Sequence, residues 1–264
     1  MTLYATPTDG TDHHQSVPEG ALQPGGWTLL RDRYARPDQR DRLVDRYLHP
    51  VEVDGYQSRL DGRAQAWLLG RVAAKDAVGQ RLAEAGYAVA ARDFAVVDDA
   101  DGRSRVLGLH HLAPELHVSV AHVDGCAVAI TGQGATVGIA IEPVEDRPSS
   151  FNRLAFTKAE RAGRHLAGVD DRTWMTAAWT AKYAVARALG TGLDGDATQF
   201  ETRVAGPGLL AVADRVVRWV QLDSATATSR DGRSLIVGWT VVPESIIDLD
   251  RPVGASTRVP RASM

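Results

Sequence analysis

Two long helical segments, each followed by short strands with tight turns, constrain the fold of this chain more than any other feature. The first runs from about Gly62 to Ala85, with apolar residues at helical spacing, and a shorter helical stretch over 40–48 precedes it. Gly86 stands where a C-cap glycine would end the long helix. Two hairpin patterns follow, with turns at Asp99 to Arg103 and at Asp124-Gly125, and then the strand TVGIAIEPVE.

The second long helix is predicted over Thr173 to Leu189, after one or two helices between Phe151 and Ala167. Three further strand patterns come after it: QFETRVA, RVVRWVQL and SLIVGWTVV. Helices followed by antiparallel strands therefore occur twice, with little sequence similarity between the two occurrences. We predict an α+β fold built as a pseudo-twofold duplication of helix plus antiparallel strands, with functional sites at the junction between the halves.

The expected boundaries divide the 264 residues into four parts. A flexible N-terminal tail covers 1–35, a first half 36–135, a second half 136–248, and a flexible C-terminal tail 249–264. The tails are assigned from their polar, Gly- and Pro-containing composition. Because the two halves are expected to pack on each other, we expect a monomer.

Charge and composition exclude several classes of protein. A net charge of −3 provides no general attraction to nucleic acid. The single cysteine, Cys126, cannot form an intrachain disulfide, and no Cys/His spacing indicates structural zinc. The N-terminus lacks the apolar core of a signal peptide, and no run of about 18 apolar residues is present. We therefore expect a cytoplasmic protein that uses neither a membrane nor a nucleic acid as partner.

The strand VGIAIEPVE (137–145) raises the question of a metal site. Alternation along a strand places its branched aliphatic residues on one buried face, while the opposite face leads through Gly138 and Ala140 to the carboxylate of Glu142. Ala140 stands where a second carboxylate could stand. Glu142 fits either a solvated strand end or a metal ligand, since magnesium is bound through one or two carboxylates.

Four further residues are candidates for chemistry. His122, beside a predicted turn, fits a phosphate donor, a general base or a polar turn residue. Arg71 and Lys75, one helical turn apart, fit a phosphate-binding patch or a solvated helix face. Lys182 lies on the apolar stripe of the second long helix, so it must reach solvent, pair with an acid or take part in chemistry.

Five segments, taken in order, resemble the motifs of the 4'-phosphopantetheinyl transferase superfamily, in the larger pseudo-dimeric form that accompanies bacterial polyketide and fatty-acid synthases. The resemblance covers about residues 40 to 245. The segments are WLLGRVAAKDAV (67–78), HVSVAHVDGCAVAI (117–130), VGIAIEPVE (137–145), FTKAE (156–160) and WTAKYAVARALGTGL (179–193). They are similar to the family's N-terminal helix motif, its Ser-His hairpin, its Gly-Ile-Asp-x-Glu strand and its remaining helical motifs.

The resemblance implies a reaction and a set of roles. In the family, a magnesium ion binds the pyrophosphate of coenzyme A, a serine of an acyl carrier protein attacks the β-phosphate, and 3',5'-ADP leaves. The matching positions imply a role for each candidate. Arg71 and Lys75 would bind the phosphate of coenzyme A, and His122 would contact a phosphate. Glu142 would be a metal-binding carboxylate, and Lys182 would be the motif lysine, which also binds the cofactor.

The departures from the family pattern fall on the catalytic centre. Ala140 replaces the aspartate that is the principal metal ligand, and Tyr183 replaces the glutamate after the lysine. Arg187 replaces a lysine, and Ala121 replaces the serine before His122. A magnesium site would thus keep one protein carboxylate instead of three. Glu160 stands where the FxxxE segment carries its glutamate.

Three functions remain open at this point. In the preferred one, the protein performs metal-independent acid/base chemistry (dehydration, cyclisation or isomerisation) on an acyl group carried by a pantetheine arm. In the second, it transfers phosphopantetheine with a rearranged magnesium site, to which Glu145 or Asp146 contributes. In the third, it is a non-catalytic partner of a carrier protein or polyketide synthase. The catalytic residues of the first would be His122, Glu142, Lys182 and Tyr183.

Overall fold

The computed structural model is an α+β protein with two five-stranded antiparallel sheets. It describes residues 27–32, 36–99, 103–123, 125–193, 196–206, 209–213, 219–229 and 231–243. The predicted C-terminal tail over 249–264 lies outside these ranges, as do residues 1–26 of the predicted N-terminal tail. Within the described part of the chain, we find no helix with the length and apolar character needed to cross a membrane.

The first sheet has the order β1-β5-β4-β3-β2 and the second the order β6-β10-β9-β8-β7. The elements before residue 134 are β1 (Trp27–Arg31), α1 (Pro37–Tyr47), α2 (Pro50–Gln57), α3 (Asp61–Glu84), β2 (Ala95–Asp98), β3 (Ser104–Leu107), β4 (Leu116–Val123) and β5 (Cys126–Gln133). Those that follow are β6 (Ala135–Pro143), α4 (Ser149–Ala155), α5 (Lys158–Gly163), α6 (Asp171–Leu189), β7 (Glu201–Gly206), β8 (Leu209–Ala213), β9 (Trp219–Thr228) and β10 (Ser234–Pro243).

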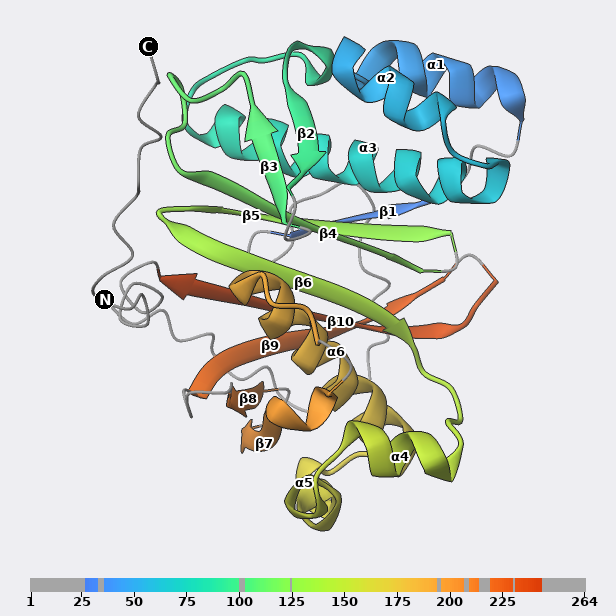
Figure 1. Cartoon of the computed structure of the whole chain (residues 1–264), viewed down its shortest axis with the longest axis vertical. Helices are drawn as coiled ribbons and strands as arrows, with labels where there is room; N and C mark the ends of the chain where they lie inside the picture. The colour runs from blue at the N-terminus through green and yellow to red at the C-terminus, as the bar shows by residue number, and fades with distance from the viewer. Residues whose placement is uncertain are drawn as a thin grey trace, which may run out of the picture.

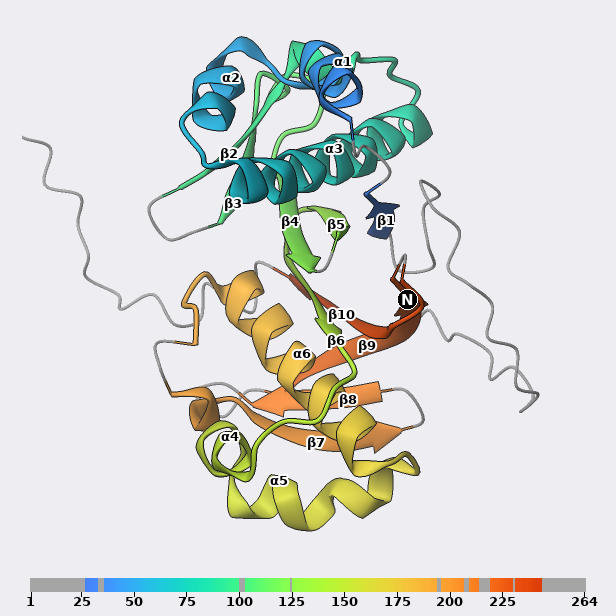
Figure 2. The same ribbon diagram turned by 90° about the vertical axis from the view of Figure 1, so that its right-hand side faces the viewer.

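The elements stack as helices, sheet, sheet, helices (Figure 1). α3 packs on β5, β4 and β1 of the first sheet, and α6 packs on β6 and β10 of the second (Figure 2). Between the sheets lies an apolar core that includes the rings of Trp27 and Trp239, whose centroids are 5.2 Å apart. The two long helices therefore lie on the outer faces of a double layer of strands.

The predicted alternation along β6 is confirmed. Ile139 and Ile141 lie in the core between the sheets, while Ala140 packs with the alanines of α6. Gly138 lies on the same face as Ala140, and a Cβ there would overlap the backbone carbonyl of Ala184. The missing side chain at Gly138 is thus what lets α6 approach the strand.

The sequence patterns anticipated most elements and missed three. The two long helices, both hairpins and the β6 strand are confirmed. The flexible tail predicted over 1–35 is wrong where β1 lies, because Trp27 and Leu29 are buried and the strand pairs with β5. The other missed elements are α2, which opens with a capping box between His49 and Glu52, and the short strand β8.

Replacing Gly138 by alanine should destabilise the protein by about 1–3 kcal/mol, because the added methyl group collides with helix backbone that cannot rotate away. Urea unfolding of the variant measures this directly. Gly79→Ala is the matched control: a Cβ at Gly79 in α3 meets nothing within 4 Å, so stability should stay level or rise by about 0.5–1 kcal/mol. Equal stability of the two variants would contradict the packing of α6 on β6.

Candidate functional site

A pocket of about 220 Å³ lies where the two sheets and the two long helices meet. α3, the β2–β3 hairpin, β4, β6 and α6 all contribute to its wall. Its lining includes Trp67, Gly70 and Arg71 from α3, Asp98, Arg103 and Ser104 from the hairpin, His117 and His122 from β4, and Arg187 from α6. The junction between the halves, where the sequence predicts a site, is thus hollow.

The pocket carries an excess of positive charge. Arg71, Arg103 and Arg187 bring three guanidinium groups to the wall, while Asp98 is the one carboxylate among the described lining residues. The Asp98 carboxylate accepts hydrogen bonds from Arg71 Nη2 at 2.6 Å and from the Ser104 hydroxyl at 2.8 Å. Guanidinium groups bind carboxylate and phosphate oxygens through paired N–H donors, so this wall suits an anionic ligand.

Several donors on the pocket residues are not used. Arg71 is only 5% exposed, and its guanidinium lies 4.7 Å from the centroid of the Trp67 ring. Arg71 Nε, Arg103 Nε and Trp67 Nε1 are buried, and in the described part of the chain no acceptor lies within reach of them. A buried donor without an acceptor costs about 1–3 kcal/mol, so a ligand with several oxygen atoms would be stabilised here.

The end of α6 positions two of the arginines. Arg187 Nη1 donates to the carbonyls of Val120 at 3.2 Å and Ile139 at 2.7 Å, and so joins β4 to β6. Arg103 Nη2 donates to the carbonyl of Leu189. The next residue, Gly190, has a φ of 68°, and a Cβ there would overlap the Arg103 guanidinium. Glycine at this C-cap therefore serves both the helix end and the pocket wall.

His122 lies on the side of β4 that faces α3. A Cβ at Gly70 would stand 3.8 Å from the His122 ring and 3.2 Å from Val120, so this glycine leaves room for the imidazole. The His122 residue as a whole is exposed, but its surroundings lower the pKa of the ring, through partial burial first and the charges of Arg187 and Arg71 after it. The neutral imidazole can accept a proton.

Glu142 lies near the end of β6. Alternation along β6 turns it toward α6, and its carboxylate accepts a hydrogen bond from Arg147 Nη2 at 2.9 Å. Burial raises the pKa of Glu142, whereas the hydrogen bond and charge of Arg147 and the charge of Arg187 oppose that rise. Among the described residues no hydrogen bond joins Glu142 to His122, and Glu142 does not line the pocket.

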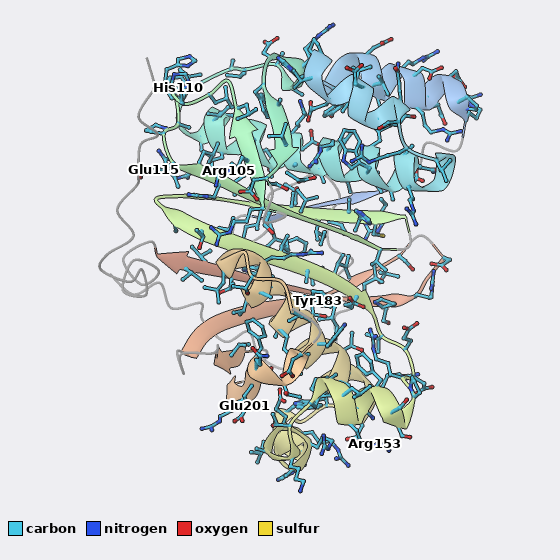
Figure 3. The ribbon with its side chains drawn as sticks, in the orientation of Figure 1. Arg105, His110, Glu115, Arg153, Tyr183 and Glu201 are labelled. Carbon is cyan, nitrogen blue, oxygen red and sulfur yellow. The ribbon has the colours of Figure 1, made fainter. Side chains whose placement is uncertain are left out.

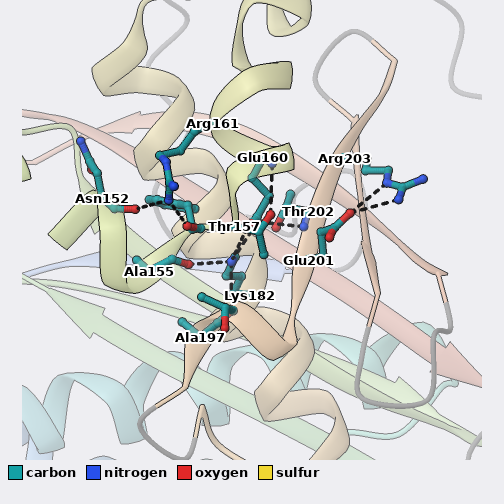
Figure 4. A network of polar contacts seen from close by, with 12 residues as sticks. Asn152, Ala155, Thr157, Glu160, Arg161, Lys182, Ala197, Glu201, Thr202 and Arg203 are labelled. Carbon is teal, nitrogen blue, oxygen red and sulfur yellow. Dashed lines mark hydrogen bonds and ion pairs between the residues drawn. The ribbon is translucent and has the colours of Figure 1, made fainter. Parts of the chain in front are cut away.

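Lys182 is paired, which is one of the three outcomes the sequence leaves open. Its ammonium group is fully buried, 2.8 Å from Glu160 Oε1, and donates to the carbonyls of Ala155 and Ala197 at 2.7 and 3.0 Å (Figure 4). Glu160 also accepts from the backbone N–H of Thr202 at 2.8 Å. All three ammonium hydrogens therefore have acceptors inside the second half, away from the pocket.

Lys75 has the same arrangement in the first half. Its ammonium group lies 2.6 Å from Glu52 Oε2 and donates to the carbonyls of Ala91 and Phe94 at 2.8 and 2.5 Å. Glu52 accepts from the N–H of Val96 at 3.0 Å. Because its ammonium group is held by these contacts, Lys75 does not line the pocket, whereas Arg71, one turn earlier on α3, does.

Tyr183 belongs to a row of rings on α6. It packs edge-on against Trp179 with centroids 4.9 Å apart, and the Arg187 guanidinium lies 5.9 Å from its centroid. The residue lies near the middle of the molecule (Figure 3). Of the predicted catalytic residues, only His122 lines the pocket, and of the predicted cofactor-binding residues only Arg71 and His122 do.

The sequence patterns did not select Asp98, Arg103, His117 or Ser104. The β2–β3 hairpin was predicted, and its pairing places Asp98 opposite Ser104. What the pattern could not show is that this hairpin reaches the end of α6, a contact between residues 86 positions apart.

A magnesium ion fits these residues poorly. In the described ranges, no three His, Cys, Asp or Glu side chains are grouped so that they could hold a metal. Ala140 contributes no oxygen and is buried among the alanines of α6. Glu142 is paired with Arg147, and Asp146, which could have replaced a ligand, lies 3.9 Å from Arg172 with 93% of its side chain exposed.

No protein-family model matches the chain, and no curated protein matches it. Among solved structures, it is similar to the holo-[acyl-carrier-protein] synthase of Thermotoga maritima, with 21% identity and a TM-score of 0.28, over 40% of this chain and 62% of that one. This chain therefore spans less than two thirds of that enzyme's length. A likeness at this level says nothing about activity, substrate or partner.

Replacing Lys182 by methionine should lower the free energy of unfolding by about 3–5 kcal/mol, because the Glu160 carboxylate stays buried without its partner. Urea unfolding gives the value. Lys158→Met is the control, since Lys158 is exposed on α5, and it should change stability by less than about 0.5 kcal/mol. If K182M is as stable as K158M, the buried pair does not have the role assigned to it.

The imidazole of His122 should titrate below the ordinary value of 6.5 in the folded protein. NMR of the histidine Cε1–H signals measures this, with His122→Gln assigning the resonance. Since the unfolded chain then takes up this proton at higher pH than the folded chain, the contribution of His122 makes stability fall as pH drops below about 6.5. A His122 pKa at or above its value in concentrated urea would contradict the described surroundings.

Proposed function

We propose that the protein binds a phosphopantetheine-bearing ligand of the coenzyme A class in the pocket between its halves, and that His122 transfers protons there without a metal ion. One observation carries the proposal. Four segments that resemble phosphopantetheinyl transferase motifs each contribute to one cationic pocket: Arg71 from the first, His117 and His122 from the second, Val137 from the third and Arg187 from the last.

The charge of the pocket supports a phosphate ligand. Three arginines against one aspartate leave an excess of positive charge, and the unused Nε donors of Arg71 and Arg103 offer further hydrogen bonds. Phosphate oxygens accept such bonds, whereas the thiol end of a pantetheine arm does not need them. We therefore place the phosphate group, rather than the acyl group, against Arg71 and Arg187.

His122 is the residue we assign to proton transfer. It lines the pocket, and its lowered pKa leaves the imidazole neutral near pH 7, ready to accept a proton from an acyl group. Glu142, Lys182 and Tyr183 are not assigned this role, because Glu142 and Lys182 are held in ion pairs and Tyr183 does not line the pocket. An acyl carrier protein or polyketide synthase would present the substrate.

We also propose that the two halves, about 27–134 and 135–243, arose by duplication. Both sheets place the first strand of their half beside the last, in the orders β1-β5-β4-β3-β2 and β6-β10-β9-β8-β7. Each half also carries a buried lysine on its long helix that pairs with a glutamate in the first turn of the preceding helix. A pocket at the junction of two such halves is the position that a shared ancestral site would occupy.

Calorimetric titration with coenzyme A, 4'-phosphopantetheine and pantetheine tests the ligand class. The two phosphorylated compounds should bind, and pantetheine should bind at least about tenfold more weakly, because a hydrogen bond to a charged group contributes about 1.5–3 kcal/mol. Arg71→Gln should reduce coenzyme A affinity by about tenfold or more. Arg153→Gln is the control, since Arg153 lies on α4, toward the far end of the molecule (Figure 3). Equal binding of pantetheine would contradict the proposal.

Removing the competing carboxylate should have the opposite effect. Asp98→Asn leaves the hydrogen-bonding shape but removes the charge that pairs with Arg71, so coenzyme A should bind about threefold to tenfold more tightly. The same titration measures it, with Asp171→Asn on the exposed surface as control. Weaker binding by the D98N variant would place the phosphate elsewhere.

Retained transferase activity is tested separately. The protein is incubated with coenzyme A, magnesium and apo acyl carrier proteins, and the mass of each carrier is read. We expect no gain of a phosphopantetheine arm. A gain that Glu142→Ala abolishes would show that transfer survives and that the metal-independent proposal is wrong.

A further inference from the structure

Arg147 lies against the Glu142 carboxylate, at the position where a metal ion bound to that carboxylate would lie. It follows β6 by four residues, and its Nη2 donates to Glu142 Oε2 at 2.9 Å. Both side chains are largely shielded, with 13% of Arg147 and 24% of Glu142 exposed. An ion pair at this depth is screened by solvent much less than a surface pair.

The aromatic ring of Phe151 packs against the guanidinium of Arg147. Arg147 lies 4.8 Å from the centroid of Phe151, which packs edge-on against Trp179 at 4.9 Å. Trp179 in turn packs on Tyr183. The Arg147 side chain is therefore fixed from the α4 side, while the charge of Arg187 also acts on Glu142 from α6.

Glu145, three residues after Glu142 in the sequence, carries a second carboxylate. The charge of Glu145 also acts on Glu142 and raises its pKa. Carboxylate oxygens are ligands for divalent cations, but a positive charge fixed against them repels such a cation.

We propose that the guanidinium of Arg147, a positive charge supplied by the chain itself, prevents divalent metal ions from binding to the Glu142 carboxylate. The guanidinium neutralises Glu142 within the chain, at 2.9 Å from its carboxylate. The proposal concerns the charge at Glu142 alone, so it stands or falls separately from the binding of coenzyme A in the pocket.

Manganese binding, read from the loss of the free Mn²⁺ signal in electron paramagnetic resonance, tests this without any assay of activity. The wild-type protein and Glu142→Gln should bind Mn²⁺ equally weakly. Arg147→Gln should bind it at least about tenfold more tightly, since one positive charge at close range is removed. Adding Glu142→Gln to Arg147→Gln should abolish the gain.

Arg172→Gln is the matched control. Arg172 lies nearby, 3.9 Å from Asp146, but both of these side chains are exposed and neither is paired with Glu142. If the R147Q and R172Q variants gained Mn²⁺ affinity equally, the gain would come from the lower positive charge of the surface in general, and the proposal would be overturned. Tight Mn²⁺ binding by the wild-type protein that Glu142→Gln removes would also overturn it, a comparison that needs no Arg147 variant to fold.

Discussion

Two buried lysine–glutamate pairs hold the long helices of this protein to their surroundings. Lys75 in α3 pairs with Glu52, and Lys182 in α6 pairs with Glu160. Each glutamate also caps its own helix and accepts a backbone N–H from the strand region that follows the long helix. Because a charge removed from water is stable only when fully paired, these contacts fix how each long helix lies against its half.

Arginine, and not lysine, supplies the positive charge of the pocket. The chain has three lysines, and two of them are in the buried pairs. The cations at the junction are Arg71, Arg103 and Arg187. Arg103 and Arg187 donate to backbone carbonyls, and Arg71 pairs with Asp98. The Nε donors of Arg71 and Arg103 have no partner among the described residues. The same preference recurs at Glu142, where Arg147 is the partner. The positive charge of the pocket therefore comes from arginine side chains.

The local part of this structure was predictable and the long-range part was not. Helical spacing predicted α3 and α6, and alternation placed Glu142 and Ala140 on the face opposite Ile139, because these patterns depend on neighbouring residues only. The partners of Lys75 and Lys182 depend on helices α2 and α5 and could not be seen in the pattern. Nor did the patterns show that His122 lines the pocket and Glu142 does not, since this depends on how β4, β6 and the two long helices pack together.

The central claim is that the cationic pocket between the halves holds the phosphate of a coenzyme A-type ligand. A crystal structure of the protein grown with coenzyme A tests it most directly. Our account predicts phosphate oxygens within hydrogen-bonding distance of Arg71 and Arg187, with the pantetheine arm passing His122. Coenzyme A phosphates bound on another surface, with Arg71 still paired to Asp98 and the pocket holding only water, would contradict it.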